Sequence, residues 1–96
     1  MNDNQGTLLI VDDERSIRHS LRTILSSFGF QIIEAARGEE ALDLVRSAQV
    51  DAVLLDIDMP GIGGIGACRG IRRSYPGIPI LMLTVHGSED HKGSCV

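Results

Sequence analysis

The feature that most constrains the fold of this chain is an alternation of short apolar runs with stretches of helical periodicity. Each run has the length of a strand, and its nearly continuous apolar character is typical of a strand buried on both faces. The runs cover Thr7–Val11, Gln31–Ala36, Asp51–Asp56 and Ile78–Val85. Strands separated by helices favour right-handed crossovers, so the sequence predicts an α/β fold with a doubly wound parallel sheet and helices on both faces.

The stretches between the runs carry helix signals. In the first, apolar residues recur at three- and four-residue steps from Ile17 to Phe28 and form one stripe. Asp13 and Glu14 lie where a helix N-terminus favours negative charge, and Gly29 is placed to end the helix. The second helix is expected over 38–48 and the third, weakened by internal glycines, over 64–75.

Composition limits the classes of function. The chain has 96 residues, which is one domain at most, and a net charge of −4 without a block of basic residues. Nucleic-acid binding and membrane insertion are therefore not expected. The polar N-terminus does not resemble a signal peptide, so we expect a cytoplasmic protein in which Cys68 and Cys95 are reduced thiols.

Acidic side chains follow two of the predicted strands directly. Asp12 and Asp13 come after the first run, Asp56 closes the third, and Thr84 lies at the end of the fourth. If the first and third strands are neighbours, three carboxylates crowd one point and repel each other unless a proton or a cation intervenes. Mg²⁺ suits such oxygen ligands. The simpler interpretation, in which Asp12 and Asp13 only cap the first helix, leaves Asp56 and Thr84 unexplained.

Two other chemistries are weaker alternatives. Gly61, Gly63 and Gly66 spell the G-x-G-x-x-G pattern of dinucleotide sites, but the strand does not run straight into the first glycine, as such a site requires. Asp56 and Asp58 form a D-x-D pair after an apolar strand, which resembles the opening motif of aspartate-nucleophile phosphatases of the haloacid-dehalogenase type. That motif usually continues with Thr or Val where this chain has proline.

The stretches "LLIVDDE", "VLLDIDMPG" and "ILMLTV" closely resemble the receiver domain of bacterial two-component response regulators. The resemblance runs without gaps from about Thr7 to Val85. It implies a flavodoxin-like receiver fold and a phosphorelay function, in which a sensor histidine kinase donates a phosphoryl group.

The resemblance also implies a role for each matching residue. Asp56 would be the phosphoacceptor. Asp13 and Asp56 would bind Mg²⁺ directly, with the backbone carbonyl of Asp58 as a third ligand, and Asp12 would hold the ion through water or share its ligation. Thr84 would contact the phosphoryl group and act as a switch. Any catalysis would be limited to self-catalysed phosphotransfer and autodephosphorylation.

The chain departs from the family pattern after the fourth strand. We expect residues 1–85 to form a partial receiver domain that lacks the fifth strand and the final helices, and residues 86–96 to form an atypical polar tail. Lys92 follows Thr84 too closely to be the lysine of the family. An unpaired fourth strand predicts self-association as a dimer or by segment exchange. The truncation, which removes the lysine of the family, is expected to impair activity, and a non-catalytic, self-associating pseudo-receiver is the alternative.

Overall fold

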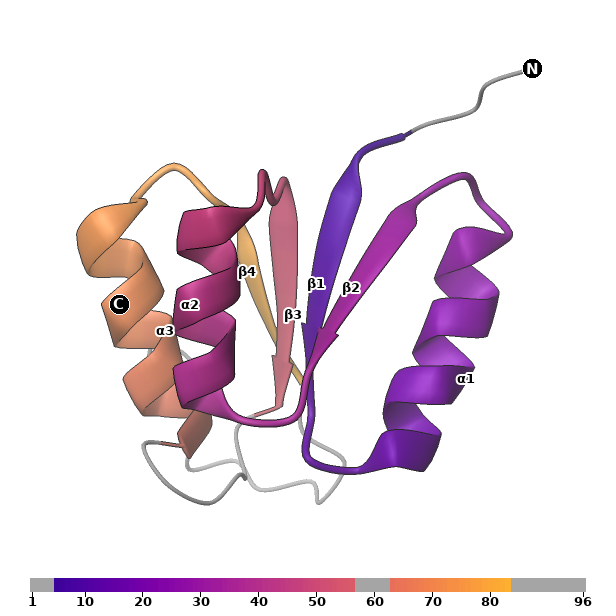
Figure 1. Ribbon diagram of the computed structural model, residues 1–96, viewed down its shortest axis with the longest axis horizontal. Coiled ribbons are helices and arrows are strands. Elements are labelled where there is room, and N and C mark those ends of the chain that lie inside the picture. The colour runs from indigo at the N-terminus through magenta and orange to yellow at the C-terminus, as the bar shows by residue number, and fades with distance from the viewer. Residues whose placement is uncertain (1–4, 57–62, 84–96) are drawn as a thin grey trace.

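Strands and helices alternate along the chain in the computed structural model, which describes residues 5–56 and 63–83 (Figure 1). Its elements in chain order are β1 (Thr7–Val11), α1 (Arg15–Ser26), β2 (Gln31–Ala35), α2 (Gly38–Ser47), β3 (Ala52–Asp56), α3 (Gly63–Ser74) and β4 (Ile80–Leu83).

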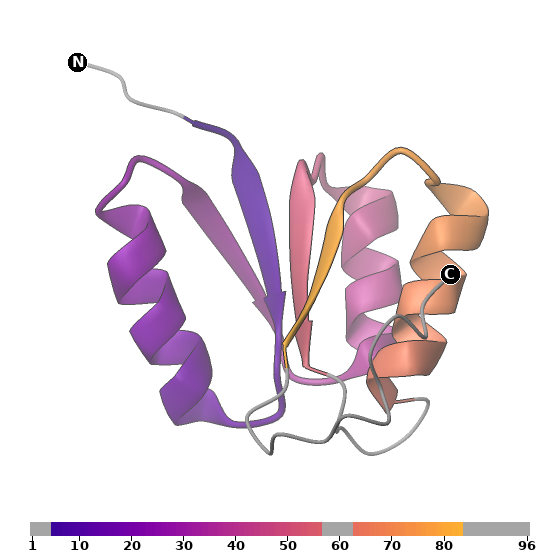
Figure 2. The ribbon, with the colours of Figure 1, turned by 180° about the vertical axis from the view of Figure 1, so that it is seen from behind.

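The sheet has the strand order β2-β1-β3-β4, and its neighbouring strands are all parallel. Helix α1 covers one face, whereas α2 and α3 lie together on the other (Figures 1 and 2). The predicted doubly wound parallel sheet is therefore confirmed, with four strands and three helices among the described residues. None of these helices has the length and apolar character that crossing a bilayer requires.

The main hydrophobic core lies between the sheet and the α2–α3 layer. Inward-facing residues of β1 and β3 are fully buried there, because both strands are central and helices cover this face. The strands contribute Leu9, Val11, Val53 and Leu55, and the helices contribute Ala41, Val45, Ala67 and Ile71. This rigid centre fixes the positions of the two strand ends that carry Asp12 and Asp56.

The opposite face of the sheet is only partly covered. Helix α1 packs on β1 and β2, and none of its residues is buried. The apolar stripe predicted for this helix is real, but its C-terminal end stays open to solvent, with Ile24 54% and Phe28 65% exposed. Leu81 on β4 is 59% exposed on the same face, where α1 packs on β1 and β2.

Two strand boundaries differ from the predicted ones by one or two residues, because a backbone group bonds outside the sheet. The Ala36 amide donates to the Glu40 carboxylate at 2.9 Å, so β2 ends at Ala35. The Ile78 amide donates to the Tyr75 carbonyl at 3.2 Å, so β4 begins only at Ile80.

Several predictions fall outside the described residues. They concern Asp58, Thr84, Gly61, Lys92, Cys95 and the tail at 86–96. The expectation of reduced thiols is wrong for Cys68, which is fully buried on α3 and disulfide-bonded. Gly63 and Gly66 lie within α3, well beyond the end of β3, so they do not form the strand-to-helix turn of a dinucleotide site.

Candidate metal and phosphoacceptor site

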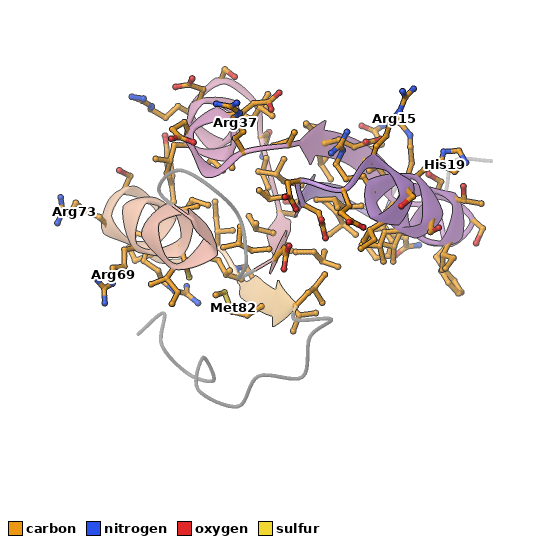
Figure 3. All side chains as sticks on the ribbon, turned by 90° about the horizontal axis from the view of Figure 1, so that it is seen from below. Arg15, His19, Arg37, Arg69, Arg73 and Met82 are labelled. Atoms are coloured by element: carbon orange, nitrogen blue, oxygen red, sulfur yellow. The ribbon has the colours of Figure 1, made fainter. Side chains whose placement is uncertain are left out.

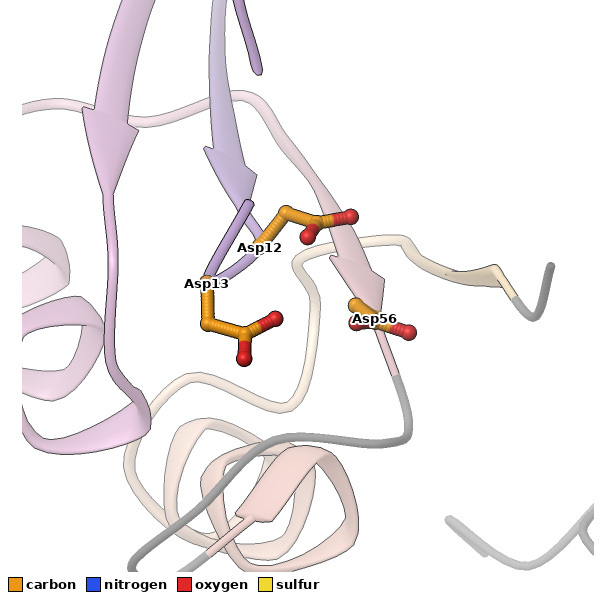
Figure 4. A group of neighbouring side chains, drawn as sticks. All are labelled: Asp12, Asp13 and Asp56. Atoms are coloured by element: carbon orange, nitrogen blue, oxygen red, sulfur yellow. The ribbon is translucent and has the colours of Figure 1, made fainter. Parts of the chain in front are cut away.

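Asp12 and Asp56 meet because β1 and β3 are neighbours in the sheet. The register pairs Val11 with Leu55, so the next residue of each strand lies at the same carboxyl edge. Asp13 follows Asp12 in the turn before α1, and one carboxylate oxygen from each of the three acids lies within 4.8 Å of the others (Figure 4). This edge is where ligands bind in open parallel sheets, at the point where the strand order reverses.

Two of the three acids are almost removed from solvent. Asp12 is 3% and Asp56 5% exposed, whereas Asp13 is exposed. Burial raises the pKa of Asp12, and the neighbouring charges of Asp13 and Glu14 raise it further, against the hydrogen bond from the Glu14 amide. Keeping these neighbouring carboxylates ionised therefore costs free energy, and a bound cation would reduce that cost.

The backbone around Asp12 is held on every side. Its amide donates to the Ala35 carbonyl at 3.1 Å. Its Oδ1 accepts the Glu14 amide at 2.9 Å, and its carbonyl oxygen accepts Nη1–H of Arg18 at 2.8 Å. Glu14 is the N-cap residue of α1 and this helix start has no side-chain cap hydrogen bond, so the bond from the Glu14 amide closes the turn before the helix and the capping interpretation is wrong.

The donor set fits Mg²⁺. Its three members are all carboxylates, with no histidine or thiolate among them, and hard oxygen ligands of this kind suit Mg²⁺ and not the softer transition metals. Asp12 and Asp56 are buried and Asp13 is exposed, and Mg²⁺ usually keeps several water ligands beside one or two carboxylates.

The structure thus brings together Asp12, Asp13 and Asp56 as predicted, while Asp58 and Thr84 lie outside the described residues. Arg18, which contacts the turn directly, was not among the residues predicted for the site. A signal for it exists: Glu34 is a lone acid in the apolar strand β2, and a lone acid on a helix-covered face needs a cationic partner.

A second concavity lies away from the acids. A cavity of about 240 Å³ lies between the C-terminal halves of α2 and α3, with Leu42, Val45, Ile71 and Tyr75 in its wall. These helices run antiparallel to the strands, so the cavity lies toward the opposite edge of the sheet and takes no part in the acidic site.

The fold and the site together define a class of protein: an open parallel α/β domain with a buried acidic cluster at its carboxyl edge. The family described as "Response regulator receiver domain" matches residues 8–96. The chain belongs to this family of two-component signalling domains, and the resemblance seen in the sequence is confirmed.

Full-length relatives extend well beyond this chain. Response regulator MprA of Mycolicibacterium vanbaalenii is 46% identical over 81 residues, which are 84% of this chain and 35% of that protein. Probable transcriptional regulator ycf27 of Guillardia theta is 49% identical over 85 residues, or 88% and 33% of the two chains. The chain thus spans about a third of the length of these curated relatives.

Solved structures agree with the fold. The response regulator TrrA from Thermotoga maritima, in complex with Mg²⁺–BeF, has a TM-score of 0.86 and 38% identity over 94% of this chain and 78% of its own. A chain of the CheX–CheY–BeF₃–Mg²⁺ complex from Borrelia burgdorferi has a TM-score of 0.88 and 34% identity, covering 96% and 71%. Both of these solved structures are complexes with Mg²⁺ and a fluoroberyllate.

Proposed function

We propose that this receiver domain accepts a phosphoryl group on Asp56 from a phosphohistidine of a sensor histidine kinase. The observation that carries the proposal is the convergence of Asp12, Asp13 and Asp56 within 4.8 Å at the carboxyl edge of the sheet. A lone buried aspartate would be costly and inert, whereas an aspartate beside two further carboxylates needs a cation that also attracts phosphate.

The chemistry proposed for Asp56 is an in-line displacement. A carboxylate oxygen attacks phosphorus, the phosphorus–nitrogen bond to the donor imidazole breaks, and the electron pair of that bond remains on the imidazole nitrogen. Water later cleaves the acyl phosphate, which releases inorganic phosphate and restores the carboxylate. Asp56 ends β3 inside a hydrophobic layer, so its side chain is held in place before the donor arrives.

The residues that would hold Mg²⁺ are Asp12, Asp13 and Asp56, together with the backbone carbonyl of Asp58. Bound there, the ion would neutralise the carboxylates and the oxygens of the incoming phosphoryl group. The contribution of the chain is to bring these ligands together before the metal binds, through the adjacency of β1 and β3.

Thr84 is proposed as the hydroxyl that contacts the phosphoryl group and reports it. The register supports this role, because Asp56 pairs with Leu83, and Thr84 is the next residue of the chain. A serine at this position would keep the hydroxyl and is the matched variant for an alanine substitution.

One incubation distinguishes this function from its alternatives. The 96-residue chain is mixed with a small phosphodonor and Mg²⁺, and its intact mass is followed with time. A mass gain that needs Mg²⁺ and disappears in Asp56→Asn supports the phosphoacceptor role. No gain in a folded, self-associated protein would indicate the pseudo-receiver, and multiple turnover of phosphate esters would indicate the phosphatase.

The proposed partners are the kinase and a second copy of this chain. Self-association is supported by the exposed apolar side chain of Leu81 on β4, a strand that pairs only with β3 among the described residues. No nucleic-acid surface is proposed, because Arg15 and His19 point outward from α1, while Arg69 and Arg73 point outward from α3 on another side (Figure 3). No membrane contact is proposed either.

A cytoplasmic location is part of the same proposal, because a kinase that uses ATP acts in that compartment. The disulfide at Cys68 is the observation against it, since cytosolic thiols are kept reduced. Counting alkylated cysteines in protein isolated from cells with a thiol reagent present decides between the two: full alkylation supports the cytoplasm.

A further inference from the structure

A cationic side chain outside the acidic cluster holds the turn on which the cluster is built. Arg18 of α1 donates Nη1–H to the Asp12 carbonyl oxygen at 2.8 Å and Nε–H to Oε1 of Glu34 at 3.0 Å. The side chains of Arg18 and Glu34 are only 15% and 24% exposed. One guanidinium thus connects α1, β2 and the turn between β1 and α1.

We propose that Arg18 is a positioning residue, which fixes the peptide between Asp12 and Asp13 so that both carboxylates face Asp56. The inference rests on the proposed function of that acidic site. It assigns a role in site geometry to a residue that touches neither the metal ligands' carboxylates nor the phosphoacceptor.

The point of contact explains why one hydrogen bond can orient two ligands. The Asp12 carbonyl belongs to the same planar peptide as the Asp13 amide, so holding that oxygen fixes the direction in which the chain enters Asp13. The other hydrogen bonds of Asp12 within the described part of the chain involve its amide, which donates to Ala35, and its side chain, which accepts from Glu14, so neither of them holds the carbonyl oxygen.

The two-directional contact requires the fork of an arginine. Nε and Nη1 lie in one rigid plane and point to different acceptors, whereas a lysine ammonium is a single charge on a flexible stem. Glu34 keeps the fork in place, and its second oxygen accepts Nη1–H of Arg22 at 2.6 Å. Arg22 is half exposed and has no hydrogen bond to the turn in the described part of the chain, so it offers a matched control.

Charge and geometry predict opposite signs for the loss of Arg18. Removing a cation near three carboxylates would by itself tighten the binding of Mg²⁺, because less positive charge opposes the ion. Loosening the turn would weaken binding, since partners that orient metal ligands are typically worth about tenfold or more in affinity. The positioning role therefore predicts weaker binding in both Arg18→Met and Arg18→Lys.

The experiment is a Mg²⁺ titration of the full chain, followed by NMR through the amide signals of residues 12–14. NMR is used because the chain has no tryptophan whose fluorescence could report binding. We expect about tenfold weaker affinity in both Arg18 variants and less than about twofold change in Arg22→Met. A second readout needs no metal: amide hydrogen exchange at Glu14 should be about tenfold faster in the Arg18 variants, while exchange within β3 is unchanged.

Each outcome decides the inference. Wild-type affinity in Arg18→Lys, tighter binding in Arg18→Met, or an equal loss in Arg22→Met would overturn it. If Arg18→Met does not fold, the Mg²⁺ affinity and the Glu14 exchange rate of Arg18→Lys and Glu34→Gln are compared with those of wild type and Arg22→Met instead. If the wild-type chain binds no Mg²⁺, the proposed function fails, and the metal-free exchange data then decide the positioning role alone.

Discussion

Asp12 and Asp56 extend adjacent parallel strands at the same edge of the sheet, and both are almost fully buried. With Asp13 they place three carboxylates within 4.8 Å. Such an arrangement is unfavourable without a cation, because neighbouring like charges in a buried place disfavour the ionised forms. The three carboxylates therefore repel each other in the folded state, and metal binding or protonation weakens this repulsion. Substitutions that remove one of the charges should change the stability of the metal-free fold.

Asp56→Asn should abolish the mass gain with a phosphodonor and, without metal, should stabilise the fold. The amide removes one buried negative charge at nearly constant shape, so the free energy of unfolding should rise by about 1–2 kcal/mol. Urea unfolding followed by circular dichroism in a chelator measures this change. With saturating Mg²⁺ the wild-type chain should gain more stability than the variant; equal gains would contradict the metal site.

The pH dependence of stability should carry the sign set by Asp12. Burial, its largest cause, raises the pKa of Asp12 above 3.8, so the folded state binds this proton more tightly than the unfolded state. The contribution is favourable at pH below 3.8 and is lost as pH rises through the raised value. In metal-free urea unfolding, Asp12→Asn should therefore lose less stability than wild type as pH rises from 4 to 7.

Glu34 should show the opposite slope. The hydrogen bond from Arg22 is the largest cause that lowers the pKa of Glu34, with Arg18 acting in the same direction. Its stabilising contribution is present above 4.5 and is lost as pH falls through the lowered value. As pH falls, the free energy of unfolding should therefore decrease more steeply in wild type than in Glu34→Gln. Equal slopes would show that the ion pairs of Glu34 contribute little to stability.

The sequence was sufficient to predict the acids at the site but not the arrangement that holds them. Asp12 and Asp56 follow buried strands, so their position at the carboxyl edge could be read from apolar periodicity. The adjacency of β1 and β3 could only be assumed from the sequence, because strand order depends on the packing of helices on the sheet. The Arg18–Glu34 pair was missed because side-chain direction depends on how α1 crosses β2, which local sequence does not determine.

Gly70→Ala should leave the stability of the fold unchanged or raise it slightly. A Cβ at this position would lie 2.7 Å from Cδ2 of Leu42, so the end of that side chain has to shift. Leu42 and Gly70 both line the cavity between α2 and α3, which leaves room for this shift, and alanine gains about 1 kcal/mol in helix propensity over glycine. Thermal unfolding should show a midpoint equal to or slightly above that of wild type, with Gly77→Ala, which has no atom within 4 Å of its Cβ, as the control. A midpoint several degrees below that of both would show that Leu42 cannot move.

Leu81→Glu should reduce self-association without unfolding the domain. Leu81 lies in register with Leu54 on the face that α1 leaves uncovered, and it is 59% exposed, so the charge enters no core. A second copy that buries this side chain would have to bury an unpaired carboxylate, at a cost of several kcal/mol. Sedimentation velocity over a range of concentrations measures the change.

The matched control for this surface is Ile24→Glu on α1. Ile24 is also more than half exposed and is likewise apolar, but it lies on a helix that packs on β1 and β2. If contact runs through the β4 edge, only Leu81→Glu should shift the chain toward monomer. A monomeric wild-type chain, or equal effects of both substitutions, would show that the edge of β4 does not mediate association.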